Sequence, residues 1–430
     1  MEQKLRRYIL PNILAMIGIS CYVLADTFFI SIAAGADGIT ALNLVLPVYG
    51  LIYALGAMVG IGSATRYSLD KAIGNPEADD YFSSAILWTL AISSVFVLGG
   101  LWNADGLLRL LGADDQILRI GLPYTRIILC FTPLFMLNYT FTAFVRNDNA
   151  PRVAMAATLS SGLFNIVFDY ILMFPLGLGM VGAALATAIS PIVSMGICMI
   201  HYLSPKNTVV FVKKRPSLRK LASGCSLGVA ALVGELSSGI TTMVFNYILL
   251  ALAGNVAVAA YGVIANIALV GTALFNGVSQ GLQPLASAVH GQCDRAGERR
   301  IYRYALQIGG GIAVCLVGAV LLFPQGMVAL FNSEGSAALA AYAVPGLRYY
   351  FLGFLLAFAN IITAGFFSAT GRGLASAAVA VSRGVVAITV LAFVLSRIWG
   401  VTGVWLAFPA AEAVTFVLAL CLLRRGRRAD

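Results

Sequence analysis

The sequence predicts an all-α polytopic membrane protein with about twelve transmembrane helices in two six-helix bundles. Of its 430 residues, 60% are hydrophobic and only 11% are charged, and the mean hydropathy is +0.90. A typical soluble domain is about half apolar and a quarter charged, so this composition excludes a soluble fold. A helix needs ~20 mainly apolar residues to cross a bilayer, and runs of that length recur along the whole chain.

The apolar runs also place the individual spans, because a run of about 20 residues is long enough for one crossing. We expect spans at residues 9–33, 39–64, 82–102, 117–143, 152–174, 179–203, 221–252, 256–290, 303–323, 339–369, 374–396 and 400–424.

The two halves of the chain resemble each other. Residues 177–187 are similar to residues 398–408, and 221 residues separate both Gly182 from Gly403 and Gly60 from Gly281. An even number of spans in each half starts both halves on the same side, which predicts parallel repeats related by an axis along the membrane normal. Duplicated halves of this kind are typical of two-lobed transporters.

The expected domain boundaries follow from the repeat and from one basic stretch between the halves. We expect a first lobe at 1–205, a cytoplasmic linker at 206–218 and a second lobe at 219–430. The linker is the one long loop with linker composition, since it holds Lys, Arg, Ser and Pro between two apolar runs.

The net charge of +10 comes from basic residues that gather on one side of the predicted topology. This positive-inside asymmetry predicts a multi-pass protein of the cell membrane with both termini in the cytoplasm, and argues against a nucleic-acid partner. The basic residues are Lys4, Arg6, Arg7, Lys206, Lys213, Lys214, Arg215, Arg219, Lys220, Arg295, Arg299, Arg300, Arg303, Arg424, Arg425, Arg427 and Arg428.

Ionisable side chains inside the bilayer cost ~2.5–3.5 kcal/mol each, so each needs a reason to be there. Glu412 and Arg383 lie at similar depth on adjacent helices, and we interpret them as a structural ion pair. The full set is Asp26, Asp169, Glu235, Glu412, Arg126, Arg348 and Arg383.

Four polar residues of the first half are predicted to lie at one depth, in the outer part of the membrane. Asp26, Asp169 and Thr187 each fall about two turns from the outer end of their spans, and Asn165 shares a helix face with Asp169 at i−4. Their oxygens would bind H⁺ or Na⁺ but not a soft metal. The alternative is that Asp169 caps a helix end while Tyr or Ser neighbours satisfy Asp26.

Cysteine and aromatic residues have mainly structural interpretations. The seven cysteines lie mostly in apolar runs without paired spacing, so we expect neither disulfides nor metal sites. Aromatic residues such as Tyr49, Tyr53 and Tyr139 are typical of a helix core, although a polyspecific cavity is built from the same groups.

Several motifs resemble the multidrug and toxic compound extrusion (MATE) family of the multidrug/oligosaccharidyl-lipid/polysaccharide exporter superfamily. The resemblance covers nearly the whole chain. It is carried by Ala25-Asp26, Leu46-Pro47, Gly60-Ile-Gly-Ser63, Arg146-Asn-Asp-Asn-Ala-Pro151, Asn165-Ile-Val-Phe-Asp169, Gly182-Ala-Ala-Leu-Ala-Thr187 and Gly277-Val-Ser-Gln-Gly-Leu-Gln-Pro284.

The resemblance implies a V-shaped pair of bundles that work by alternating access. Asp26, Asn165, Asp169 and Thr187 match the family's first-lobe cation site. The Na⁺-linked branch has a second-lobe acid at the position of Glu235 and another in the tenth helix. Residues 351–360 of this chain hold no acid, which favours coupling through the first lobe.

We therefore expect a secondary-active exporter that exchanges H⁺ or Na⁺ for small amphipathic organic cations. We expect a monomer in contact with membrane lipid, without enzyme activity and without a cofactor beyond the coupling ion. The alternatives are a flippase for a lipid-linked substrate and an intramembrane enzyme. The expected substrate cavity holds Glu235, Tyr124, Tyr139, Gln280 and Gln283, and the expected hinges are Pro11 and Pro47.

Overall fold

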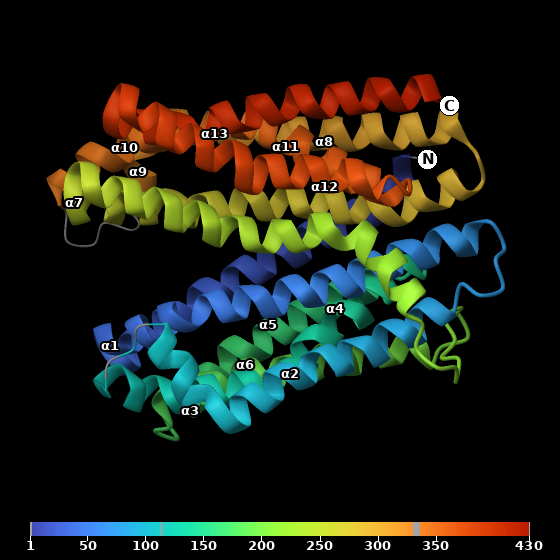
Figure 1. Ribbon diagram of the computed structural model, residues 1–430, viewed down its shortest axis with the longest axis horizontal. Coiled ribbons are helices and arrows are strands. Elements are labelled where there is room, and N and C mark those ends of the chain that lie inside the picture. The colour runs from blue at the N-terminus through green and yellow to red at the C-terminus, as the bar shows by residue number, and fades with distance from the viewer. Residues whose placement is uncertain (1, 112, 114, 330–335, 430) are drawn as a thin grey trace. The chain divides into compact units, whose positions relative to one another are not determined.

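Figure 1 shows the computed structural model, which describes residues 2–111, 113, 115–329 and 336–429. All regular elements within these ranges are helical, as predicted. They are α1 (Glu2–Ala72), α2 (Asp80–Leu110), α3 (Asp115–Cys130), α4 (Thr132–Asn147), α5 (Pro151–Met173), α6 (Gly179–Tyr202), α7 (Leu218–Gly291), α8 (Arg295–Leu322), α9 (Pro324–Ala329), α10 (Ala337–Phe351), α11 (Phe354–Ala369), α12 (Gly373–Val381), the π-helix η1 (Ser382–Val386) and α13 (Ala387–Ala429).

The described helices account for the predicted spans. Eight helical segments are long and apolar enough to cross a membrane, among them two within α1, at Arg7–Ile30 and Leu44–Ala72. Two more spans are bent pairs, α3 with α4 at 45° and α10 with α11 at 48°. Pro133 lies in the first turn of α4, directly after the first bend. Proline has no backbone N–H to continue the preceding helix and is favoured where a new helix begins.

Two of the eight segments are too long for one crossing. α7 has 74 residues, about 110 Å of helix against a hydrocarbon core of ~30 Å. It is interrupted at Gly254 (φ 72°). The other over-long segment, Gly373–Arg425, has 53 residues and is interrupted within α13 at Gly400 (φ 58°). Both glycines adopt a left-handed conformation that other residues avoid, so each turns the chain back. Counted this way, the described helices supply the twelve predicted spans.

The chain forms two compact units. Unit 1 comprises Met1–Ile13, Leu236–Val289 and Asp294–Asp430, and unit 2 comprises Leu14–Glu235 and His290–Cys293. Within each unit the long helices run alongside one another (Figure 1). The lobe boundaries proposed from the sequence repeat, at 205 and 219, stay a prediction.

Small residues bring helices into close contact within each unit. In unit 2, a Cβ on Gly228 would overlap the carbonyl oxygen of Met58. In unit 1, a Cβ on Gly281 would lie 2.7 Å from the Cα of Ile9. Helices in lipid associate through such close packing, because lipid tails are as apolar as the helix surfaces and no hydrophobic force drives the helices together.

Candidate cation and substrate site

The four residues of the predicted cation site belong to unit 2 and come from three helices. Asp26 lies on α1, Asn165 and Asp169 lie one turn apart on α5, and Thr187 lies on α6. Asn165 and Asp169 are buried, with 1% and 0% exposure. The amide nitrogen Nδ2 of Asn165 donates to the hydroxyl of Thr187 at 3.1 Å, so the structure joins α5 to α6 through two predicted residues.

The same cluster holds an excess of oxygen acceptors. Both carboxylate oxygens of Asp169, Oδ1 of Asn165 and Oδ1 of Asp26 are buried without a hydrogen-bond partner in the described chain. The carboxyl groups of Asp26 and Asp169 also lie within electrostatic reach of each other. A buried acceptor without a donor costs ~1–3 kcal/mol. The cluster therefore fits a ligand that supplies positive charge or a proton to oxygen.

Glu235 lies at an aromatic wall in the same unit. The hydroxyl of Tyr139 donates to Oε1 of Glu235 at 3.3 Å. The ring centroid of Tyr139 lies 6.0 Å from that of Tyr53, which lies 5.3 Å from that of Tyr49. Glu235 is exposed while Tyr53 and Tyr139 are half-buried, so the carboxylate is accessible beside a row of rings.

Tyrosines also connect Glu235 with the cation cluster. The half-buried Tyr22 interacts electrostatically with both Asp26 and Glu235. Tyr124 on α3 is 1% exposed and lies near Asp26 and Tyr49. Tyr124 is one of the residues expected in the cavity, whereas no role was predicted for Tyr22. The available signal was its i−4 spacing from Asp26, which places both side chains on one helix face.

The remaining predicted residues lie elsewhere on the described helices. Gln280 is half-buried and Gln283 is buried, and both lie on the part of α7 that belongs to unit 1. Pro11 and Pro47 lie within α1, whose backbone is helical at both positions. Their cavity and hinge roles stay predictions.

A second polar cluster lies in unit 1. Nε of Arg383, on the π-helix η1, donates to Oε1 of Glu412 at 2.8 Å, which confirms the predicted ion pair. Nδ2 of Asn360 donates to Oε2 of Glu412 at 2.7 Å and to its backbone carbonyl at 2.9 Å. Glu412 is 1% exposed, so a cation and an amide compensate its burial.

The described residues contain no group of three His, Cys, Asp or Glu side chains arranged to hold a metal ion. The cluster of Asp26, Asn165, Asp169 and Thr187 offers instead two carboxylates, one amide and one hydroxyl, which are hard oxygen donors.

Comparisons with known proteins agree with this architecture. The MatE family model matches residues 11–171 and 230–394. The multidrug export protein MepA of Staphylococcus haemolyticus is 30% identical over 423 residues, covering 96% of this chain and 91% of that protein. MepA of Staphylococcus saprophyticus is 28% identical over 413 residues, covering 94% and 89%.

Solved structures share the fold. An outward-facing multidrug resistance MATE family transporter of the MOP superfamily superimposes with a TM-score of 0.92 at 24% identity, over 99% of this chain and 96% of that one. A MOP superfamily transporter from Pyrococcus furiosus gives 0.91 at 23% identity, with the same coverage. Since the family model matches well over half of the sequence, this chain belongs to the MATE family.

Proposed function

We propose that this protein is a secondary-active multidrug exporter that exchanges H⁺ or Na⁺ for amphipathic organic cations by alternating access. The observation that carries the proposal is the set of four unpartnered oxygens on Asp26, Asn165 and Asp169. Polar groups inside a membrane protein cost free energy unless they have partners. The oxygens of this cluster gain partners when the cluster holds a proton or a hard cation.

Support for drug export comes from the relatives. The two staphylococcal proteins are named multidrug export proteins, and this chain covers about nine-tenths of each. Alignment over nearly the full length leaves both halves of the transporter represented, so the export function is proposed for the whole chain.

The cationic nature of the substrate is proposed from the surroundings of Glu235. A carboxylate attracts a cation, and the adjoining rings of Tyr53 and Tyr139 present π-faces that attract it further. A cation within ~6 Å of a ring centroid gains about 0.5–2 kcal/mol, depending on how far it is desolvated. Flat aromatic cations suit this wall best, because they also bury apolar area against the rings.

The proposed coupling joins this wall to the cation cluster. Loading H⁺ or Na⁺ between Asp26 and Asp169 would supply the missing partners and cancel like-charge repulsion, so the loaded cluster favours a different packing of α1 and α5. Tyr22 lies near both Asp26 and Glu235, so a change at Asp26 would alter the electric field at Glu235 and favour drug release.

The alternative of a lipid-linked-sugar flippase has less support. Such a flippase would hold a diphosphate with free arginines. Of the three arginines expected within the membrane, Arg383 is bonded to Glu412 at 2.8 Å, which leaves Arg126 and Arg348 as the candidates for holding a diphosphate.

Transport in proteoliposomes tests the proposal. Purified protein is reconstituted with a fluorescent organic cation, and a pH gradient or a Na⁺ gradient is imposed separately. We expect one gradient to drive uphill drug movement and an ionophore that collapses it to stop that movement. Drug movement that needs neither gradient would overturn antiport.

Replacing Glu235 by Gln should weaken export of cationic drugs more than export of neutral drugs. The variant keeps a hydrogen-bond partner for Tyr139 but removes the negative charge that attracts the substrate. Drug resistance of cells and initial rates in vesicles would be compared for both drug classes. Glu77→Gln, at an exposed acid between α1 and α2, is the matched control. Equal losses for both drug classes would show that Glu235 serves folding.

The basic linker should be accessible only from the cytoplasm. The exposed cysteines Cys21, Cys293, Cys315 and Cys421 would first be replaced. A cysteine at exposed Lys213 should then react with a membrane-impermeant maleimide only after cells are permeabilised.

A cysteine at Leu176, in the loop between α5 and α6, should react in intact cells. The reverse labelling pattern would refute the proposed orientation.

A further inference from the structure

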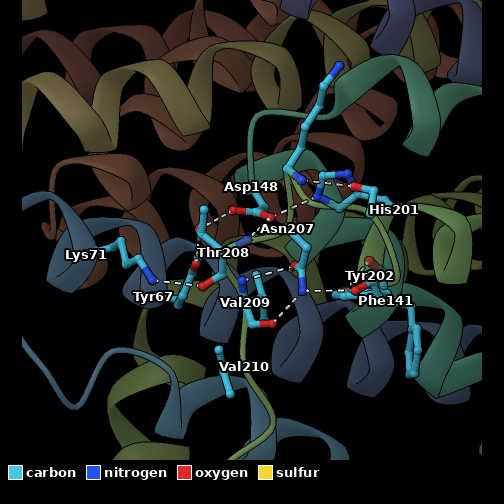
Figure 2. Close-up of polar contacts among 12 residues, drawn as sticks. Tyr67, Lys71, Phe141, Asp148, His201, Tyr202, Asn207, Thr208, Val209 and Val210 are labelled. Carbon is cyan, nitrogen blue, oxygen red and sulfur yellow. Dashed lines mark hydrogen bonds and ion pairs between the residues drawn. The ribbon is translucent and has the colours of Figure 1, made fainter.

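The chain between α6 and α7 is fixed to unit 2 by side chains. We call residues 203–219, which run from the end of α6 to the second residue of α7, the linker strap. Figure 2 shows its attachment at Thr208, whose backbone nitrogen donates to Oδ2 of Asp148 at 2.9 Å and whose hydroxyl donates to Oδ1. Lys71 of α1 donates to the carbonyl of Thr208 at 2.9 Å. The strap therefore has a defined position on this unit.

Asp148 lies within the motif Arg146-Asn-Asp-Asn-Ala-Pro151, to which the proposed transport function assigns no role. It is 3% exposed, and its Oδ2 also lies 2.8 Å from Nε2 of the buried His201. A carboxylate with three partners in a buried place is costly to disturb. Asp148 thus acts as the principal anchor of the strap.

A second set of contacts fixes the next residues. The backbone nitrogen of Val210 donates to Oδ1 of Asp79 at 3.2 Å, and that of Val212 donates to the hydroxyl of Ser83 at 2.7 Å. Val209 is 3% exposed and contributes to the core of unit 2. With one side chain inside and the backbone bonded, the neighbouring side chains are held outward.

Those outward side chains are apolar. Val210 is 57% exposed and Phe211 is 47% exposed, and Leu203 and Leu218 at the two ends of the strap are 80% and 67% exposed. Exposed apolar groups that lie next to one another on a fixed backbone mark a surface that binds a protein or a membrane.

Cations lie between these apolar residues. Lys214 and Lys220 pair with Asp80 at 3.2 and 2.8 Å. Four other basic residues are exposed and form no ion pair within the described part of the chain, namely Lys206, Lys213, Arg215 and Arg219. The strap thus combines apolar groups with uncompensated positive charge.

The two ends of the strap fix its depth. α6 ends at Tyr202 and α7 begins at Leu218, and both belong to candidate membrane spans. A short segment between two span ends lies at the level of the lipid headgroups. Exposed apolar side chains flanked by Lys and Arg are the pattern that binds anionic membrane surfaces, where each basic residue attracts headgroup phosphate.

We propose that the linker strap is a lipid-docking surface. Phe211 and Val210 enter the headgroup region of the adjoining leaflet, and Lys206, Lys213, Arg215 and Arg219 bind the phosphates of anionic lipids, while Asp148 and Asp79 hold the backbone in place.

A photo-crosslinker at position 211 tests where the apolar side chain lies. Phe211 is replaced by p-benzoyl-phenylalanine in the full-length protein, in nanodiscs of phosphatidylcholine with phosphatidylglycerol. After illumination, intact-mass spectrometry should show an added mass of one phospholipid. The same probe at exposed Pro76, in the loop between α1 and α2, should show several-fold less. An unmodified mass at position 211, or in whole cells an adduct to another protein, would overturn the proposal.

Charge removal tests the lipid class. Lys206, Lys213, Arg215 and Arg219 are replaced by Gln together, and the midpoint of thermal unfolding is measured in nanodiscs with and without phosphatidylglycerol. We expect anionic lipid to raise the midpoint of the wild type and this rise to fall by more than half in the variant. The matched control, Arg299, Arg300, Arg424 and Arg425 replaced by Gln, removes equal charge elsewhere and should keep most of the rise. Equal losses in the two variants would show that only net charge matters.

An Asp148→Asn variant tests the attachment of the strap while leaving its exposed lipid-docking residues unchanged. The amide loses one acceptor, so Thr208 should be released while the basic residues remain. We expect the lipid adduct at position 211 to become weaker and to spread over more lipid species. An unchanged adduct would show that Asp148 does not hold the strap.

Discussion

Replacing Asp26 by Asn is expected to abolish ion-driven drug export and leave the protein folded in the membrane. The amide keeps the shape of the side chain but removes the charge that, with Asp169, would hold H⁺ or Na⁺. Asp26 is half-buried, and its buried Oδ1 has no partner, so the substitution breaks no observed hydrogen bond of that oxygen. The measurement is drug efflux from proteoliposomes under a fixed gradient, together with drug binding to the purified variant.

Two controls define this result. Asp105→Asn makes the same chemical change near the end of α2, at a residue whose side chain is 50% exposed, and should export at the wild-type rate. Asp26→Glu restores the carboxylate and should recover part of the export. Wild-type export by Asp26→Asn would exclude coupling through this cluster. Loss of drug binding as well as export would indicate a role in the substrate cavity.

Replacing Glu412 by Gln should destabilise the protein by about 3–5 kcal/mol, because it leaves the guanidinium of Arg383 in a membrane-embedded unit without its counter-charge. At roughly 2–4 °C per kcal/mol, the midpoint of thermal unfolding should fall by about 10 °C. The midpoint would be followed in detergent by size-exclusion chromatography of heated samples.

The double variant Arg383→Gln with Glu412→Gln is the matched control for this effect. It removes both charges and keeps polar groups of similar size, so it should regain most of the lost stability. A double variant as unstable as Glu412→Gln alone would show that packing around Glu412, and not charge compensation, is responsible.

Depth along the helices accounts for most of what the sequence could predict. Arg383 and Glu412 were paired by depth on adjacent helices, and the 2.8 Å contact confirms that pair. The third partner, Asn360, was missed because its contact spans 52 residues and a single amide in an apolar helix carries no spacing signal. Sequence gives the depth of a side chain but not the rotation of its helix.

Breaks in the helices show the same limit. The span boundaries predicted near residues 254 and 400 are present, because the backbone leaves the helical conformation at Gly254 in α7 and at Gly400 in α13. Proline was a weaker guide. Pro123, Pro191 and Pro284 lie inside helices, since neighbouring groups in a membrane bundle tolerate the missing donor. Local chemistry permits a kink there, whereas tertiary packing decides whether it forms.

The buried contacts of the linker strap had no sequence signal at all. Asp148 and His201 are 53 residues apart, and each resembles an ordinary polar residue near a helix end. Only the fold brings them together, because α6 returns to the end of unit 2 at which α4 finishes.

The composition of the two compact units has a consequence for biogenesis. The first thirteen residues belong to unit 1, although the rest of the first repeat forms unit 2. Residues 218–235 open the second repeat and yet belong to unit 2. Synthesis proceeds from the N-terminus, so unit 2 lacks a helix segment until Glu235 leaves the ribosome. The first thirteen residues of the chain can pack only later, after the rest of unit 1, which begins at Leu236, has been synthesised. Neither half of the polypeptide, made alone, contains a complete unit, and insertion into the membrane must therefore precede final assembly of both.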